Sequence, residues 1–468
     1  MLKKLGLISF IFTFSFMSIF PFINTASANI DTIAEGAIIV DAETGKILYE
    51  KNIDTPLIPA SMVKMMTEYL ILEAVENGDI SWDQIVPISS ELAALSHDEN
   101  LSNVMLRVDE QYTVRDLYES VAIYSANAST MALGELIAGS YSRFIEMMNE
   151  KGKEIGMGTL LREEGEKVGL SNLDEIASRG IGDFQFVNST GLSNHHLDGN
   201  HPEGTGENED NYMSVRATAI LAYRLLNDYP EVLDTQSIPD KWFKEGTEDQ
   251  ILMENWNWML PGSIEPQHDY EYVDGLKTGS LGAGFISFTG TGIKDGQRLI
   301  TVVMGLQERA QRFNETERLM EFGFNNFHRE EIFPAEMVLE GYETIPVVNG
   351  TEDEVSISTT DAVSALIYRG EEESYTYSIQ FDEDLLDDEG RLEAPIEANQ
   401  VIGKMIVEYT GSGEEKYLED TNPSSRQVDI VTNEAVERAG WFSLMIRNIG
   451  GFFSGLWGSI ADTFRGWL

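Results

Sequence analysis

A serine and a lysine stand three residues apart at the start of a strongly apolar run, in Ser61-Met62-Val63-Lys64. Positions i and i+3 of a helix share one face, so Ser61 Oγ and Lys64 Nζ meet if this run is helical. A lysine buried on such a helix loses solvation, which favours its neutral form. A neutral amine beside a hydroxyl is a general base beside a nucleophile. The alternative is that Ser61 only caps the helix while Lys64 reaches the surface.

Two further short motifs carry the same kinds of side chain, a serine hydroxyl in one and a lysine amine in the other. Ser125-Ala126-Asn127 falls in a break between two predicted helices, and Lys277-Thr278-Gly279 leads into a predicted edge strand. Each motif alone is weak. In this order they are close to the Ser-x-x-Lys, Ser-Asp-Asn and Lys-Thr-Gly set that penicillin-binding proteins share with class A β-lactamases.

The elements that must position these motifs follow from hydrophobic patterning. The patterns predict a β-hairpin over 36–50, a buried helix after residue 60, a helix over 113–124, strands over 284–292 and 297–306, and a helix over 312–327. Thr113 and Asp116 are placed to form a capping box. Residues 151–180 are rich in glycine and charge, and are predicted to be irregular. This order favours an α/β (α+β) domain over 29–330, with an antiparallel sheet and a helical subdomain.

The pattern changes near residue 333. Apolar and polar residues alternate in short runs over 333–425, which predicts a small all-β sandwich. Over 432–468, and most clearly from Ala439 onward, large apolar residues recur every three or four positions. This predicts an amphipathic helix that lies in a membrane interface, because charged residues interrupt it too often for a span. The alternative is a helix docked on the protein's own core.

The N-terminus has the layout of a secretory signal peptide. Lys3 and Lys4 precede an apolar run, and Ala26-Ser27-Ala28 provides a cleavage site with small residues. We therefore predict a signal peptide over 1–28 and an exported mature chain, the alternative being a retained membrane anchor.

Composition excludes several classes of function. The formal net charge of −47 would repel nucleic acid, so no nucleic-acid partner is expected. The chain has no cysteine, which rules out disulfides and thiolate zinc sites. His195, His196 and His201 lie in a polar, acidic stretch that is better explained as a solvated loop than as a metal site.

Three segments extend the motif pattern to a family. Residues 59–70, 188–192 and 274–279 resemble the low-molecular-mass D-alanyl-D-alanine carboxypeptidases of the penicillin-binding protein 5 type. The resemblance covers the whole chain: signal peptide, catalytic domain, β-sandwich and C-terminal anchor. It implies a peripheral enzyme on the outer face of the cytoplasmic membrane that needs no metal and no cofactor.

The resemblance also implies a role for each motif residue. Ser61 would attack the carbonyl between the last two D-alanines of a peptidoglycan stem peptide, and Lys64, kept neutral by burial and cationic neighbours, would take its proton. Ser125 would relay a proton to the leaving D-alanine, and Asn127 would hold Lys64 and the substrate amide.

The third motif would bind the substrate's end. Lys277, Thr278 and Gly279 would hold the terminal carboxylate, and the backbone N–H groups of Ser61 and Ser280 would form the oxyanion hole. Water would then release the acyl-enzyme, and β-lactams would acylate Ser61 by the same route.

Three positions depart from the pattern, and two other functions stay open. Ala126 replaces the aspartate of the second motif, which weakens a class A β-lactamase interpretation. Val63 stands where many relatives carry threonine, and Ser280 where many carry histidine. The alternatives are a serine β-lactamase, which would need a deacylating glutamate, and a non-catalytic membrane-bound scaffold or β-lactam sensor.

Overall fold

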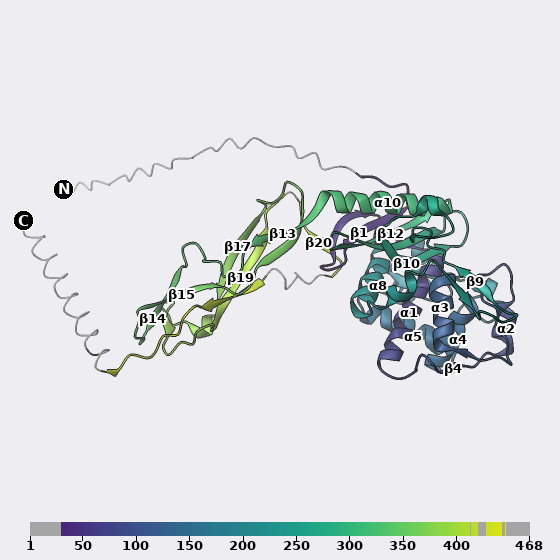
Figure 1. Ribbon diagram of the computed structural model, residues 1–468, viewed down its shortest axis with the longest axis horizontal. Helices are drawn as coiled ribbons and strands as arrows, with labels where there is room; N and C mark the ends of the chain where they lie inside the picture. Colours follow the sequence, from purple (N-terminus) through teal and green to yellow (C-terminus); the bar gives the residue numbers. More distant parts are fainter. Residues whose placement is uncertain (1–29, 412, 420–426, 442–444, 446–468) are drawn as a thin grey trace, which may run out of the picture. The chain divides into compact units, whose positions relative to one another are not determined.

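The computed structural model describes residues 30–411, 413–419, 427–441 and 445 (Figure 1). The predicted signal peptide lies outside the described residues, and so does most of the predicted C-terminal helix. Among the residues that are described, no helix combines the length and the hydropathy that a membrane crossing requires.

A six-stranded sheet, in the order β10-β11-β12-β1-β2-β20, organises the N-terminal domain. Its strands are β1 (Gly36–Asp41), β2 (Lys46–Lys51), β10 (Val273–Ser280), β11 (Ile286–Lys294), β12 (Gln297–Leu306) and β20 (Lys416–Tyr417). All five pairings are antiparallel, which confirms the predicted hairpins. The Lys277 motif does not precede the edge strand, because it lies within the edge strand β10 itself.

Helices cover both faces of this sheet. α10 (Arg309–Asn326) packs on β12 and β11 from one side, while α8 (Val215–Asp228) packs on β12 and β1 from the other (Figure 1). α1 (Lys64–Glu76) contacts α8 and is buried along almost its whole length, as its apolar run predicted. The 3-10 turn η1 (Ala60–Val63) precedes α1 and contacts β10 and β11. The start of α1 is therefore held against the edge of the sheet.

The helical subdomain surrounds α1. α3 (Val114–Tyr124), α4 (Asn127–Ala138) and α5 (Tyr141–Glu154) all pack on it. Thr113 caps α3, and its side chain and that of Asp116 form the predicted capping box. Smaller elements complete the domain: α2 (Ser90–Ser96), α9 (Val232–Gln236), η2 (Asn194–Leu197), η3 (Pro266–His268), β3 (Pro56–Leu57), β4 (Ile85–Val86), β5 (Tyr112–Thr113), β6 (Phe184–Gln185), β7 (Tyr212–Ser214), β8 (Asp240–Phe243) and β9 (Ile251–Glu254).

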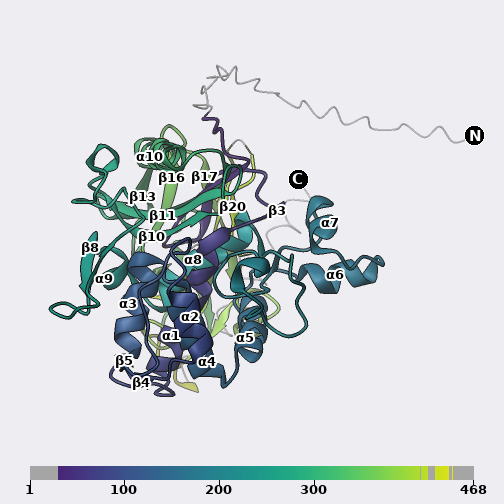
Figure 2. The ribbon, with the colours of Figure 1, turned by 90° about the vertical axis from the view of Figure 1, so that its right-hand side faces the viewer.

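The prediction that residues 151–180 are irregular is wrong. α5 continues to Glu154, and two short helices follow, α6 (Leu161–Lys167) and α7 (Leu173–Ser178) (Figure 2). Leu161, Leu173 and Ile176 pack in a small hydrophobic cluster together with Val187 and Tyr212. Gly156, Gly158, Gly169 and Gly180 lie between or just after the helices and have positive φ, whereas Gly152 and Gly165 lie within α5 and α6. Each helix is too short to show a clear period in the sequence.

The C-terminal domain is all β, as predicted. Its main sheet has the order β17-β19-β21-β15-β14-β18, and β13 pairs with β16. The strands are β13 (Phe327–Phe333), β14 (Thr344–Val348), β15 (Glu354–Thr359), β16 (Val363–Tyr368), β17 (Tyr375–Phe381), β18 (Leu392–Glu393), β19 (Val401–Tyr409) and β21 (Gln427–Thr432), with η4 (Glu383–Leu385) between β17 and β18. β13 follows α10 directly, and β21 lies beyond residue 425, so strands extend past both predicted limits of this domain.

The capping box of α3 gives a direct test of local stability. We expect Thr113→Ala to lower the free energy of unfolding by about 1 kcal/mol, because the backbone N–H of Asp116 loses its acceptor. Urea denaturation of both proteins measures this difference. Ser171→Ala, at an exposed position, is the control and should change stability by less than about 0.5 kcal/mol. An equal effect of the two substitutions would contradict the capping role.

Candidate active site

Close backbone approaches hold Ser61 in place. Ala60, directly before it, has a φ of +47°, which is uncommon for a residue with a side chain. A Cβ on Gly191 would lie 2.0 Å from the carbonyl oxygen of Ala60, and a Cβ on Gly279 would lie 2.3 Å from that of Pro59. Only glycine fits at both positions. The loop over 188–192 and strand β10 therefore clamp the turn that carries the serine.

Lys64 is completely buried and contacts three oxygens. Its Nζ lies 2.6 Å from the carbonyl oxygen of Thr190, 2.9 Å from Asn127 Oδ1 and 3.3 Å from Ser61 Oγ. Thr190 O and Asn127 Oδ1 are pure acceptors, so they take two N–H groups. A neutral amine then has its lone pair left for the third partner, Ser61. The geometry suits a general base beside its nucleophile.

The electrostatics of the site favour the neutral form of Lys64. Burial lowers the pKa of Lys64 well below its ordinary value of 10.5, and the positive charge of Lys277 lowers it further. The carboxylate of Glu68 opposes both effects without cancelling them. Burial is thus the largest cause of the lowered pKa, since removing a charged amine from water is costly.

The second motif forms the turn between α3 and α4. Ser125 ends α3 in the left-handed conformation, with a φ of +63°, and Asn127 begins α4. The Ser125 hydroxyl is buried and has no hydrogen-bond partner within the described part of the chain. Asn127 Nδ2 donates to the carbonyl of Ser102 at 3.0 Å, which fixes the amide with its oxygen toward Lys64. A buried hydroxyl without a partner points to a role toward a bound molecule.

The third motif lies along β10, paired with β11. Lys277 and Thr278 are buried, and burial lowers the pKa of Lys277 to about 8, with Glu68 opposing that shift and Arg312 adding to it. Arg312 is itself buried, and its Nη1 donates to the carbonyl of Gly279 at 3.0 Å. Two positive groups, Lys277 and Arg312, therefore lie at this strand.

A pocket of about 360 Å³ brings the motifs together. Of the residues predicted from the sequence, it is lined by Ser61, Ser125, Asn127, Thr278 and Ser280. Lys64, Lys277 and Gly279 are not among the lining residues and lie behind this surface.

Sequence reasoning missed other residues of the wall, namely Tyr124, Trp256, Arg309 and Arg312. The Tyr124 and Trp256 rings stack at 6.3 Å, and the Arg309 guanidinium lies 5.3 Å from the centre of the Trp256 ring. The available signals were Trp256 and Trp258, together with Arg312 at the start of the predicted helix and Arg309 just before it.

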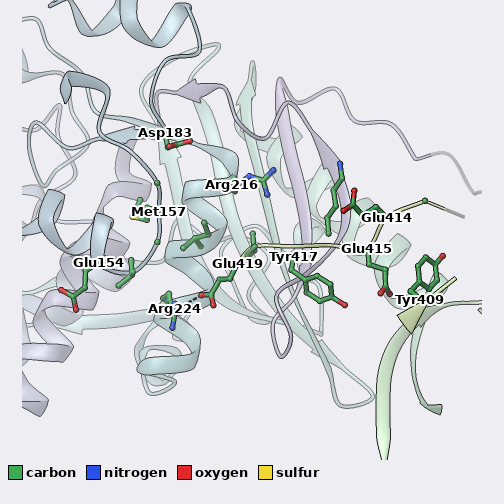
Figure 3. Close-up of a pocket in the computed structure, with 17 residues that line it drawn as sticks. Glu154, Met157, Asp183, Arg216, Arg224, Tyr409, Glu414, Glu415, Tyr417 and Glu419 are labelled. Carbon is green, nitrogen blue, oxygen red and sulfur yellow. Dashed lines mark ion pairs between the residues drawn. The ribbon is translucent and has the colours of Figure 1, made fainter. Parts of the chain in front are cut away.

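A larger cavity, of about 1010 Å³, contains none of the predicted site residues (Figure 3). It lies between the α5–α6 connection, α8 and the segment 413–419, which adds β20 to the edge of the sheet. Its three cationic side chains are paired with carboxylates: Arg224 with Glu419, Arg216 with Asp54, and Lys416 with Glu50. These pairs connect surface segments and contain no nucleophile–base arrangement.

Comparison with known proteins settles the family. Residues 23–179 and 168–308 match the family model described as D-alanyl-D-alanine carboxypeptidase, and residues 327–438 match the C-terminal domain of penicillin-binding protein 5. This chain belongs to the D-alanyl-D-alanine carboxypeptidase family. The resemblance drawn from the motifs is confirmed.

Individual relatives extend over nearly the full chain. The D-alanyl-D-alanine carboxypeptidase DacC of Escherichia coli is 28% identical over 96% of this chain and 94% of its own. DacF of Bacillus subtilis is 25% identical, with 89% of each chain covered. The peptidoglycan synthesis regulatory factor PBP3 of Streptococcus pneumoniae is similar in structure, with a TM-score of 0.66 and 30% identity over 87% of this chain and 100% of its own.

The pKa shifts of the two lysines predict a bell-shaped pH profile for acylation by a fluorescent penicillin. The rate should rise with pH as Lys64 loses its proton, well below pH 10.5, and should fall above about pH 8 as Lys277 loses its charge. The second-order rate constant of labelling, measured across pH, gives both limbs. Lys167→Met, which removes an exposed lysine, should leave both limbs in place. A rate that keeps rising well above pH 8 would contradict the role of Lys277.

Proposed function

We propose that this protein is a serine-type D-Ala-D-Ala carboxypeptidase, which removes the terminal D-alanine from peptidoglycan pentapeptide stems through an acyl-enzyme on Ser61. One observation carries the proposal: Nζ of the fully buried Lys64 lies 3.3 Å from Ser61 Oγ, and its other two contacts are to carbonyl-type oxygens. This is the arrangement that activates a hydroxyl nucleophile.

In the acylation step, Ser61 Oγ attacks the carbonyl carbon of the scissile peptide bond while Lys64 accepts the hydroxyl proton. The oxyanion that forms is stabilised by the backbone N–H groups of Ser61 and Ser280, whose residues line the same pocket. Ser125 passes its hydroxyl proton to the amine of the departing D-alanine and recovers a proton from Lys64, which returns to its neutral form. Its hydroxyl suits this role because it has no partner within the described residues.

The substrate's terminal carboxylate is recognised at β10. Lys277 supplies positive charge from behind the pocket surface, Arg312 supplies it from the pocket wall, and Thr278 presents a hydroxyl in the pocket. A chain with a formal charge of −47 repels anionic peptides, so this local group of cations is needed to admit one. Asn127 holds Lys64 with its oxygen and orients the substrate's amide beside it.

Water completes the cycle by hydrolysing the ester on Ser61 after D-alanine has left. A β-lactam acylates the same serine, but its leaving amine stays tethered within the acyl group. The blocked site then excludes the water, and the adduct persists. Hence β-lactams act as inhibitors and not as good substrates.

The sequence patterns near the two ends of the chain support a proposal for the location of the enzyme. We propose that residues 1–28 direct export and that residues 439–468 attach the protein peripherally to the outer face of the cytoplasmic membrane. The supporting observation is the sequence pattern of this tail, in which large apolar residues recur mostly every three or four positions and Arg447 and Asp462 interrupt the run.

A pentapeptide ending in D-Ala-D-Ala tests the proposed reaction. We expect mass spectrometry to show the loss of one alanine with the wild type and no loss with Ser61→Ala, because the nucleophile is gone. Ser171→Ala serves as the matched serine control and should act like the wild type. Rapid turnover of penicillin without peptide cleavage would instead indicate a β-lactamase. Equal penicillin labelling of Ser61→Ala and wild type would show that another residue is the nucleophile.

The tail can be tested separately by ending the chain after Arg438. We expect the truncated protein to appear in the soluble fraction and the full chain in the membrane fraction, with similar rates of penicillin labelling. Cell fractionation with labelling of both fractions measures this. Retention of the truncated protein on membranes would contradict the anchor.

A further inference from the structure

Helix α1 carries a second buried ionisable group, Glu68, one turn after Lys64. Its side chain has no solvent exposure, and its two carboxylate oxygens accept hydrogen bonds from Gln236 Nε2 at 2.8 and 2.7 Å. Carboxylates are almost never fully buried unless a nearby group compensates them. Glu68 has no role in the proposed acylation of Ser61, so the burial of its carboxylate requires a separate explanation.

The compensation does not come from a direct ion pair. Glu68 forms no salt bridge with any described residue, and its only hydrogen-bond donor there is the neutral amide of Gln236. The positive groups near it are the two active-site lysines, and its charge raises the pKa of both Lys64 and Lys277. Charges interact over longer distances in a site without water, because the effective dielectric constant is low.

Glu68 interacts more strongly with Lys277 than with Lys64, because Lys277 lowers the pKa of Glu68 more than Lys64 does. For Lys277, the attraction of Glu68 is the largest charge effect and exceeds the repulsion from Arg312. For Lys64, the repulsion from Lys277 exceeds the attraction of Glu68. A negative Glu68 therefore raises the pKa of Lys277 and keeps it protonated. A protonated Lys277 in turn lowers the pKa of Lys64 and favours its neutral form.

The other groups that face Glu68 do not reverse this effect. Gln236, from α9, stabilises the ionised carboxylate by donating to it and opposes the effect of burial, which raises the pKa of Glu68. Tyr118, from α3, is buried, and burial together with the charges of Glu68, Glu231 and Asp234 raises its pKa well above the ordinary value. Tyr118 thus stays neutral and adds no charge.

We propose that Glu68 is a positioning residue that decides which active-site lysine holds the proton, so that Lys277 is charged for the substrate carboxylate while Lys64 is neutral for Ser61. The proposal rests on the proposed carboxypeptidase function. Glu68 contacts neither Ser61 nor the pocket, so it acts only through the two lysines.

The test is the pH profile of penicillin acylation in Glu68→Gln, which removes the charge and keeps the shape. Loss of a negative charge makes both lysines easier to deprotonate. We expect the alkaline limb to move to lower pH by about one unit, the acid limb to move less in the same direction, and the bell to narrow. Glu76→Gln, an exposed change of equal charge on the same helix, should leave both limbs unmoved.

Several outcomes separate the possibilities. A uniform fall in rate with unmoved limbs would assign Glu68 a structural role and overturn the proposal, and so would an unchanged profile. A wild type that penicillin does not label would instead overturn the proposed function. Thermal melting shows whether Glu68→Gln folds.

Two more variants keep the test decisive if Glu68→Gln is unstable. Gln236→Leu removes the donor that keeps Glu68 ionised, so its alkaline limb should also move to lower pH, by a smaller amount. Glu68→Asp retains the charge and should keep the limbs near those of the wild type. Wild-type limbs in Gln236→Leu, or a shift in Glu68→Asp as large as that expected for Glu68→Gln, would contradict the proposal.

Discussion

The cost of burying the Lys64 amine is the physical constraint on which the site depends. An ammonium group that is cut off from water gives up its proton readily, and the fold supplies carbonyl-type oxygens for the two N–H groups that remain. Burial makes Lys64 a base, but it also lowers the pKa of Lys277 on strand β10 and so favours the loss of its charge. The site therefore has to keep Lys64 neutral and Lys277 charged, although both side chains are buried.

The architecture achieves this by bringing distant segments to the start of α1. Strand β10, the loop over 188–192 and the turn between α3 and α4 each contact the segment that carries Ser61 and Lys64. Gly191 and Gly279 permit contacts between backbones that any Cβ would prevent. Because the sheet, the helices and the loop each supply one group, the site exists only when the whole N-terminal domain is folded.

Much of this could be predicted from the sequence. The spacing of Ser61 and Lys64 and the apolar run behind them required a buried helix, and the capping box of α3 was visible in Thr113 and Asp116. Local pattern was enough in these cases because the residues involved are neighbours along the chain. The prediction for 151–180 is wrong because α6 and α7 are stabilised by a small cluster that they share with Val187 and Tyr212, and not by a long periodic face.

The contributions of Glu68, Gln236 and Arg312 could not be predicted, because they come from tertiary contacts. Arg312 lies at the start of α10 and reaches the carbonyl of Gly279 only because that helix packs on the sheet. Glu68 looks like a surface carboxylate in the sequence, and its position facing Gln236 depends on how α9 packs. These contacts join residues that are far apart in the sequence, so the hydrophobic periodicity of a single segment cannot predict them.

The most direct test of the account is the pKa of Lys64 itself. Heteronuclear NMR of protein with labelled lysine side chains, with the Lys64 signal assigned by comparison with Lys64→Arg, follows this one amine through a pH titration. We expect Lys64 to titrate well below its ordinary pKa of 10.5 and to be neutral at the pH where acylation is fastest. A Lys64 that keeps its proton up to its ordinary pKa would contradict its role as the base for Ser61.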